Sequence, residues 1–200
     1  MIKNITNELL PTKPLIPLDL SKVEYIVLHH ADAKNCTWKD INAWHKTNGW
    51  NCAGYAEFIS KDGTVYIMRG DNIGAQCQDW NSKSYGICCE GDFDIDEISQ
   101  PQFDSLVERI KYNIPRFPCF KDVVKHSKLF NTTCPGDKFP FENVMAWVKH
   151  KELNFEESVK ELVSAGIINS PEYWLNNAVD GEICDGRYVQ KLIISCANEL

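Results

Sequence analysis

The sequence of 200 residues lacks any long uninterrupted run of apolar residues, although 44% of its residues are hydrophobic. A membrane-spanning helix needs about 18 or more such residues in succession, so we expect no membrane insertion. The first twenty residues mix charged and amide side chains with three prolines. They therefore lack the apolar core of a secretory signal peptide, and we expect a protein that is made in the cytoplasm.

Basic residues are also scarce, since 21 Lys and Arg stand against 28 Asp and Glu for a formal net charge of −7. A nucleic-acid-binding surface needs a clustered basic face, so we expect no nucleic-acid partner. Residues 151–200 hold four Lys and Arg but nine Asp and Glu, so most of the acidity lies there. Together with the length, this change in charge indicates two parts, residues 1–150 and a small part at 151–200.

Strand and helix patterns alternate within the larger part. The apolar run at 23–29 predicts a buried central strand, and the turn Lys61-Asp62-Gly63 predicts a hairpin between two short strands. A hairpin among longer crossovers indicates an α/β fold, a central mixed sheet flanked by helices. The expected strands are 23–29, 55–60, 64–68, 84–90 and 123–126, and the expected helices are about 37–48, 99–114 and 141–150.

Three residues in this part offer the side chains of a metal site. They are His29, at the end of the apolar run, and His126 and Cys134, eight residues apart. Two imidazoles and a thiolate can fill three corners of a tetrahedral zinc site and leave the fourth to water, which is typical of hydrolytic zinc. Taken alone, the three residues also leave open a structural zinc with a fourth protein ligand.

Other histidines and one tryptophan have less specific interpretations. His30 points to the face opposite His29 and is expected to be packed or hydrogen-bonded in the core. In the helix at 37–48, Trp44 shares a stripe with Ile41 and is expected in the core, whereas His45 is expected at the surface.

Short motifs occur in a set order between residues 23 and 145, and together they resemble one family. They are Tyr25-Ile26-Val27-Leu28-His29-His30, Trp44-His45-Lys46, Gly49-Trp50, Gly54-Tyr55, Asp62-Gly63-Thr64-Val65-Tyr66, Arg69-Gly70, Gly74-Ala75, Asn81-Ser82, Tyr85-Gly86-Ile87, Gly91-Asp92-Phe93 and Thr132-Thr133-Cys134-Pro135-Gly136. This series resembles the zinc-dependent N-acetylmuramoyl-L-alanine amidases, which are related to the peptidoglycan-recognition proteins.

The resemblance implies one zinc ion held by His29, His126 and Cys134, with Tyr55 and Thr132 as catalytic residues. Water activated by the zinc would cleave the amide bond between N-acetylmuramic acid and L-alanine in bacterial peptidoglycan. Two positions depart from the family pattern: Gln76 replaces a frequent histidine, and Glu90 replaces an apolar residue. Four residues are candidates for substrate binding, two of them for their flat aromatic faces: Trp50, Gln76, Trp80 and Asn81.

Residues 151–200 predict three short helices, too few for a large core. The stretch from Leu162 to Trp174 resembles helical modules at the carboxyl ends of endolysins from phages of Gram-positive anaerobes. We therefore expect a module that binds the cell wall or pairs with a second copy of the chain in a homo-oligomer.

The expected function is that of a phage or prophage endolysin, which reaches the wall only after a partner permeabilises the membrane. A bacterial autolysin or an amidase that recycles wall fragments is the alternative enzyme. The non-enzymatic alternative is a sensor that binds peptidoglycan without cleaving it. Relatives of that kind commonly lack the cysteine ligand, so the presence of Cys134 argues against the sensor.

Overall fold

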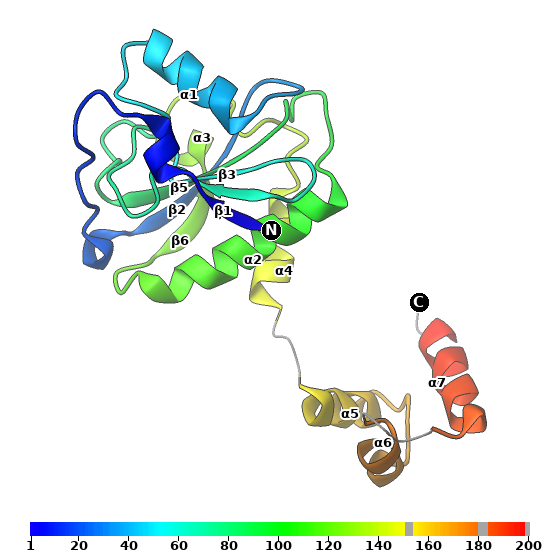
Figure 1. Ribbon diagram of the computed structural model, residues 1–200. Helices are drawn as coiled ribbons and strands as arrows, with labels where there is room; N and C mark the ends of the chain where they lie inside the picture. Colours follow the sequence, from blue (N-terminus) through cyan, green and yellow to red (C-terminus); the bar gives the residue numbers. More distant parts are fainter. Residues whose placement is uncertain (151–153, 180–183, 199–200) are drawn as a thin grey trace. The chain divides into compact units, whose positions relative to one another are not determined.

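The computed structural model describes residues 1–150, 154–179 and 184–198. The chain divides into two compact units, Met1–His150 and Lys151–Leu200 (Figure 1). Within the described residues, no helix is both long enough and apolar enough to cross a membrane.

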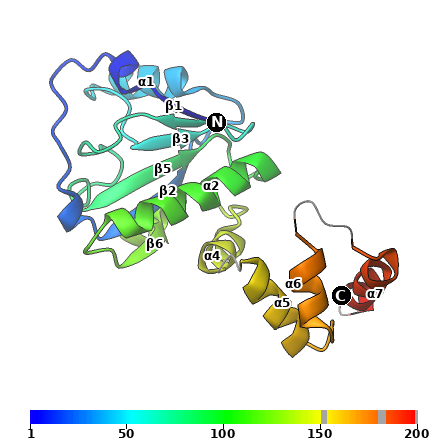
Figure 2. The same cartoon turned by 60° about the horizontal axis from the view of Figure 1, so that its bottom comes forward.

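The first unit is built on a sheet of six strands in the order β1-β4-β3-β5-β2-β6, with β1 and β6 at its two edges (Figure 2). Only the β3–β4 pair is antiparallel, and it forms the expected hairpin; the other four pairs are parallel. The prediction of a mixed sheet is therefore confirmed. The strands are β1 (Ile2–Asn4), β2 (Tyr25–His30), β3 (Glu57–Ile59), β4 (Val65–Ile67), β5 (Ser84–Cys89) and β6 (Asp122–Lys125).

Helices cover both faces of the sheet (Figure 1). Helix α1 (Trp38–Thr47) begins at a capping box formed by Thr37 and Asp40, and it covers one face. Helices α2 (Gln100–Asn113) and α4 (Phe141–Lys149) pack against each other and cover the opposite face. Each face therefore has its own hydrophobic cluster, and β2 and β5 are buried between the two.

The amino-terminal segment belongs to the fold, which the sequence did not indicate. Strand β1 pairs in parallel with β4 at one edge of the sheet. The residues after it bring Ile5 and Leu9 into the same cluster as α1, where they are 4% and 0% exposed. The first nine residues are therefore part of the domain's sheet and core.

The phase of α1 corrects two expectations. Trp44 is 44% exposed and lies outside the core. His45 is half-buried instead, and its Nδ1 accepts a hydrogen bond of 2.8 Å from the backbone N–H of Gly54. The residue four positions after the buried Ile41 faces inward, whereas the residue three positions after it does not.

Two carboxylates perform structural roles in the first unit. Glu57 in β3 is fully buried. Its carboxylate forms an ion pair with Arg109 through two hydrogen bonds and accepts a third hydrogen bond from the hydroxyl of Tyr85. Glu90, the departure from the family pattern, accepts hydrogen bonds from the backbone N–H groups of Cys36 and Lys61. Both side chains therefore tie the sheet to segments distant in sequence.

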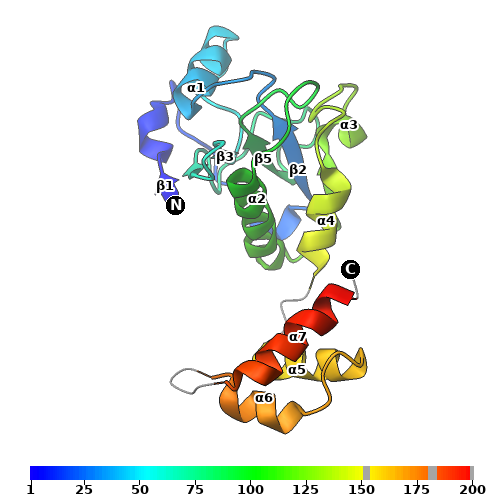
Figure 3. The same cartoon turned by 90° about the vertical axis from the view of Figure 1, so that its right-hand side faces the viewer.

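The second unit contains helices α5 (Phe155–Ser164), α6 (Pro171–Asn177) and α7 (Gly186–Asn198) (Figure 3). A capping box of Asn154 and Glu157 starts α5, and Gly166, with φ of +74°, follows its end. The small core consists of Val159, Ile168 and Trp174 with partly buried neighbours. These are the three short helices that the sequence predicts.

Candidate metal centre and substrate groove

The candidate metal ligands come from the carboxyl ends of two adjacent parallel strands. In the pairing of β2 with β6, Leu28 lies opposite Lys125, so His29 and His126 follow at the same end of the sheet. His126 begins the short helix α3 (His126–Leu129), and Cys134 lies in the loop after it. Carboxyl ends of parallel strands are the usual place for binding sites in such sheets.

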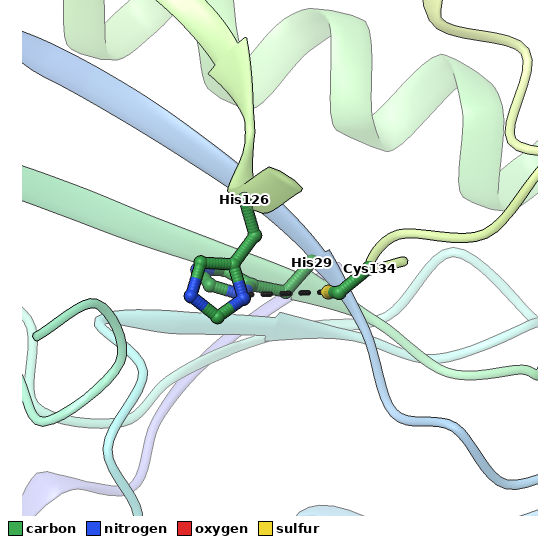
Figure 4. Close-up of side chains that lie close together, drawn as sticks. All are labelled: His29, His126 and Cys134. Atoms are coloured by element: carbon green, nitrogen blue, oxygen red, sulfur yellow. Dashed lines mark hydrogen bonds between the residues drawn. The ribbon is translucent and has the colours of Figure 1, made fainter. Parts of the chain in front are cut away.

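The three side chains point toward one another (Figure 4). Nδ1 of His29 lies 3.6 Å from Sγ of Cys134, and one ligand atom from each residue lies within 4.8 Å of the others. The rings of His29 and His126 are 4.4 Å apart. His30 faces the other way, and its Nδ1 accepts a hydrogen bond from the backbone N–H of Phe93, as the sequence suggests for a core histidine.

This donor set fits a zinc ion. Bond lengths of about 2.3 Å to sulfur and 2.0–2.1 Å to nitrogen, at tetrahedral angles, separate a sulfur and a nitrogen ligand by about 3.6 Å. The observed separation between His29 and Cys134 has this value. In addition, Nε2 of His126 is buried without a hydrogen-bond partner. A buried ring nitrogen without a partner is costly, and a metal ion bound to its lone pair would satisfy it.

Burial controls the protonation of the three side chains. It lowers the pKa of His29 well below its usual value, with the nearby His126 adding to the effect, and it also lowers the pKa of His126. Both imidazoles are therefore neutral near pH 7, as ligands must be. Burial also raises the pKa of the Cys134 thiol to about 12. The thiol consequently keeps its proton until a cation replaces it.

The two expected catalytic residues lie beside this centre. The ring of Tyr55 is 5.0 Å from the ring of His29. Burial raises the pKa of Tyr55 well above its usual value, and the neighbouring Cys88 adds to the effect, so the hydroxyl remains protonated. Thr132 accepts a hydrogen bond from the backbone N–H of Cys134 through Oγ1. Each residue therefore keeps a hydroxyl proton that it can donate.

Close contact between two loops holds Tyr55 in place. A Cβ added at Gly54 would lie 2.1 Å from the carbonyl oxygen of Ala75, so the two loops can approach this closely only with glycine there. Arg69, which is 6% exposed, donates hydrogen bonds to the carbonyl oxygens of Cys52, Ala53 and Ile73. The loop before Tyr55 is thus fixed to the loop that carries Gln76.

A groove of about 350 Å³ adjoins the metal centre. Three of the four residues that the sequence suggests for substrate binding line it, namely Trp50, Gln76 and Asn81, together with His126. The fourth, Trp80, is not among the lining residues, since its ring packs edge-on against Tyr25 at 5.3 Å.

Two residues of this region were not anticipated from the sequence. His45 packs between the rings of Trp50 and Tyr55, at 4.5 and 5.3 Å. Burial lowers its pKa to about 4, helped by the charge of Arg69. Phe130 lines the groove and stacks on His126 at 5.7 Å. The signals in the sequence were the spacing of His45 from Ile41 and of Phe130 from His126, four residues in each case.

Comparison with known proteins agrees with this architecture. The family described as N-acetylmuramoyl-L-alanine amidase matches residues 19–137. The solved structure of the endolysin N-acetylmuramoyl-L-alanine amidase LysCS from Clostridium intestinale URNW is 30% identical with a TM-score of 0.68, covering 76% of this chain and 97% of that one.

Two curated relatives represent the phage and animal branches. An endolysin of Enterobacteria phage K11 is 27% identical over 124 residues, which are 58% of this chain and 76% of the relative. Peptidoglycan-recognition protein LB of Drosophila melanogaster is 28% identical over 149 residues, which are 68% of this chain and 63% of the relative. Because the family match extends over more than half of the chain and includes the three candidate metal ligands, the protein belongs to the N-acetylmuramoyl-L-alanine amidase family of peptidoglycan hydrolases.

Proposed function

We propose that this protein is a zinc-dependent endolysin that hydrolyses the amide bond between N-acetylmuramic acid and L-alanine in bacterial peptidoglycan. The observation that carries the proposal is the convergence of His29, His126 and Cys134, with a nitrogen–sulfur separation suited to tetrahedral zinc. When bound, zinc lowers the pKa of water to about 7 and polarises a carbonyl group.

The neighbouring hydroxyl groups supply the remaining chemistry. Tyr55 keeps its proton because burial raises its pKa, so it acts as a hydrogen-bond donor rather than as a base. Thr132 uses its oxygen to accept from the N–H of Cys134, which leaves its own proton free. Both donate to the oxygen of the scissile carbonyl, where negative charge develops during attack by water.

The groove would hold the substrate on either side of this bond. Trp50 is 42% exposed and Phe130 is 44% exposed, and both line the groove beside His126. Flat apolar rings of this kind pack well against sugar rings and peptide stems. Asn81 also lines the groove, and its Oδ1 accepts hydrogen bonds from the backbone N–H groups of Gln76 and Cys77.

The endolysin role is supported by the phage relatives and by the second unit. Both the Clostridium structure and the phage K11 relative carry the name endolysin. As an endolysin the protein would act after a partner permeabilises the membrane, and residues 151–200 would bind the wall or pair with another copy. An autolysin is the alternative enzyme with the same chemistry.

A peptidoglycan sensor without activity is the second candidate, because peptidoglycan-recognition proteins are among the relatives. A sensor needs the groove but not the metal ligands. The full set of three candidate ligands, with a buried ring nitrogen of His126 that has no hydrogen-bond partner, favours the enzyme.

Turbidity of purified cell walls, recorded with and without a chelator, tests the proposal. We expect lysis that stops with the chelator, resumes with added zinc and exposes new amino groups of L-alanine. Cys134→Ser should bind the walls but leave them intact. If the wild-type protein binds walls without releasing amino groups, it is a sensor and not an amidase.

The variant Tyr55→Phe tests the assigned donor. Turnover should fall on the order of 10²–10³-fold, as for other lost oxyanion donors, while the zinc content of the purified protein stays unchanged. A loss of zinc together with activity would mean that Tyr55 supports the metal rather than the reaction.

Deletion of residues 151–200 tests the second unit. If this unit binds the wall, its removal should lower affinity for walls while cleavage of a soluble muropeptide continues at the original rate. Sedimentation of the full chain at several concentrations then tests the pairing of copies.

A further inference from the structure

Gln76 lines the groove, but its side chain is buried and reaches the candidate metal centre. Its side chain is 7% exposed, and its Oε1 lies 2.5 Å from Nε2 of His29. Gly86 in β5 makes this position available, because a Cβ there would lie 2.7 to 3.0 Å from three atoms of the Gln76 side chain. The backbone N–H of Gln76 is held by Oδ1 of Asn81 at 2.8 Å.

A chain of hydrogen bonds runs from Trp80 through Ser84 and Gln76 to His29, and the donor of each bond can be assigned. The carbonyl oxygen of Trp80 can only accept, so the hydroxyl of Ser84, 2.9 Å away, donates its one proton to it. The oxygen of Ser84 must then accept from the Nε2 amide group of Gln76, at 2.7 Å. This orientation turns Oε1 of Gln76 toward His29.

The end of the network determines the tautomer of His29. Because Oε1 of an amide has no proton to give, Nε2 of His29 has to carry one and donate it. A neutral imidazole protonated at Nε2 has its lone pair on Nδ1. Nδ1 is the atom of His29 that faces Sγ of Cys134.

We propose that Gln76 is a positioning residue of the metal centre, which holds His29 as the Nε2–H tautomer so that Nδ1 is ready to bind zinc. The inference rests on the proposed zinc-dependent function and assigns Gln76 a role different from substrate contact. Second-sphere partners of this kind fix ring orientation and increase the basicity of the ligand, and their loss typically costs 10–100-fold in metal affinity.

Zinc affinity, measured by competition with a chromophoric chelator, is the first test. Gln76→Met keeps the length of the side chain without an acceptor and should weaken zinc binding about 10–100-fold. Gln76→Glu can still accept from Nε2 of His29 and should recover most of that loss. Gln100→Met makes the same replacement at an exposed glutamine in the first turn of α2 and should bind zinc like the wild type.

The tautomer itself is the second readout, and it does not depend on activity. Long-range ¹H–¹⁵N correlation spectra of the histidine rings in the zinc-free protein should show His29 protonated at Nε2. In Gln76→Met they should show a mixture of both tautomers. The spectrum of His29→Gln identifies the signals. A variant that merely loosened the fold would not change the tautomer of one ring.

If Gln76→Met fails to fold, as judged by its circular dichroism melting curve, Ser84→Ala serves as the alternative test. Removal of the hydroxyl frees the amide of Gln76 to reverse, so zinc affinity should fall and the His29 signals should again show both tautomers. Unchanged affinity and unchanged signals in the folded variants would overturn the inference. If the wild-type protein itself binds no zinc, the proposed function fails, whereas the spectra still decide the role of Gln76.

Discussion

The proton on Cys134 provides a quantitative test of the proposed zinc centre. Burial raises the pKa of this thiol to about 12, so the zinc-free protein is protonated there at pH 7. Zinc binds the thiolate, and binding therefore has to release this proton. At 1.36 kcal/mol per pKa unit, deprotonation at pH 7 opposes zinc binding by about 7 kcal/mol.

Titration calorimetry in buffers of different ionisation enthalpy counts the released protons. His29 and His126 add little to the count, because burial lowers their pKa values from 6.5 and both are neutral at pH 7. The comparison is made at pH 8, where a carboxylate at position 134 is ionised even if burial raises its pKa by as much as that of the thiol. Cys134→Asp then offers an anionic ligand without a proton to release, and any proton lost by water on the ion occurs in both proteins. We therefore expect the wild type to release about one proton more than this variant.

The matched control is Cys119→Asp, the same replacement at an exposed cysteine. It should release as many protons as the wild type. Equal release by the wild type and Cys134→Asp, with zinc bound in both, would refute the reasoning, because Cys134 would then either not be a ligand or already be a thiolate without metal.

Three further predictions concern stability, measured by urea denaturation of the zinc-free protein. Arg109→Met leaves the fully buried Glu57 carboxylate without its charged partner and should cost about 3–5 kcal/mol, much of which the double variant with Glu57→Gln should restore; an unchanged midpoint in the single variant would contradict this. Gly54→Ala forces a Cβ to within 2.1 Å of a carbonyl oxygen and should cost about 3 kcal/mol, whereas Gly49→Ala, with open space but φ of +81°, should cost about 1 kcal/mol; equal losses would mean that the contact with Ala75 is not limiting. His45 has a folded-state pKa of about 4, so the unfolded chain takes up its proton first as the pH falls below 6.5. Between pH 7.5 and 5.5 the wild type should therefore lose about 1 kcal/mol more than His45→Gln, and parallel pH profiles would exclude this assignment.

The alternation of apolar runs with turn signals was sufficient to predict most of the sheet. Strand β2 is apolar on both faces, so its burial and the position of His29 at its end follow from the sequence. Strand β1 was missed because it has only three residues, all exposed, and its strand character comes from pairing with β4. Pairing between distant segments leaves no local signal.

In the site, too, local sequence patterns predict some features, whereas contacts between distant segments cannot be predicted from them. His29, His126 and Cys134 were predicted from residue type and motif order, and the structure brings them together. The sequence pattern places Trp44 rather than His45 on the inward side of α1, because Ile41 and Trp44 are apolar residues three positions apart, and the structure shows the reverse. Gln76 could be noted as a departure, but its contacts depend on the absence of a side chain at Gly86, ten residues away.

Strand β1 also has a consequence for the solubility of the protein. It occupies the free side of β4, and the backbone N–H of Val65 donates to the carbonyl oxygen of Met1. Without residues 1–4, the hairpin would present an unpaired row of backbone donors and acceptors, which is a template for association between sheets of different molecules. None of residues 1–4 belongs to either hydrophobic cluster of the first unit or lines the groove, so such a truncated protein should fail first by aggregation during expression and storage, before any change in its chemistry.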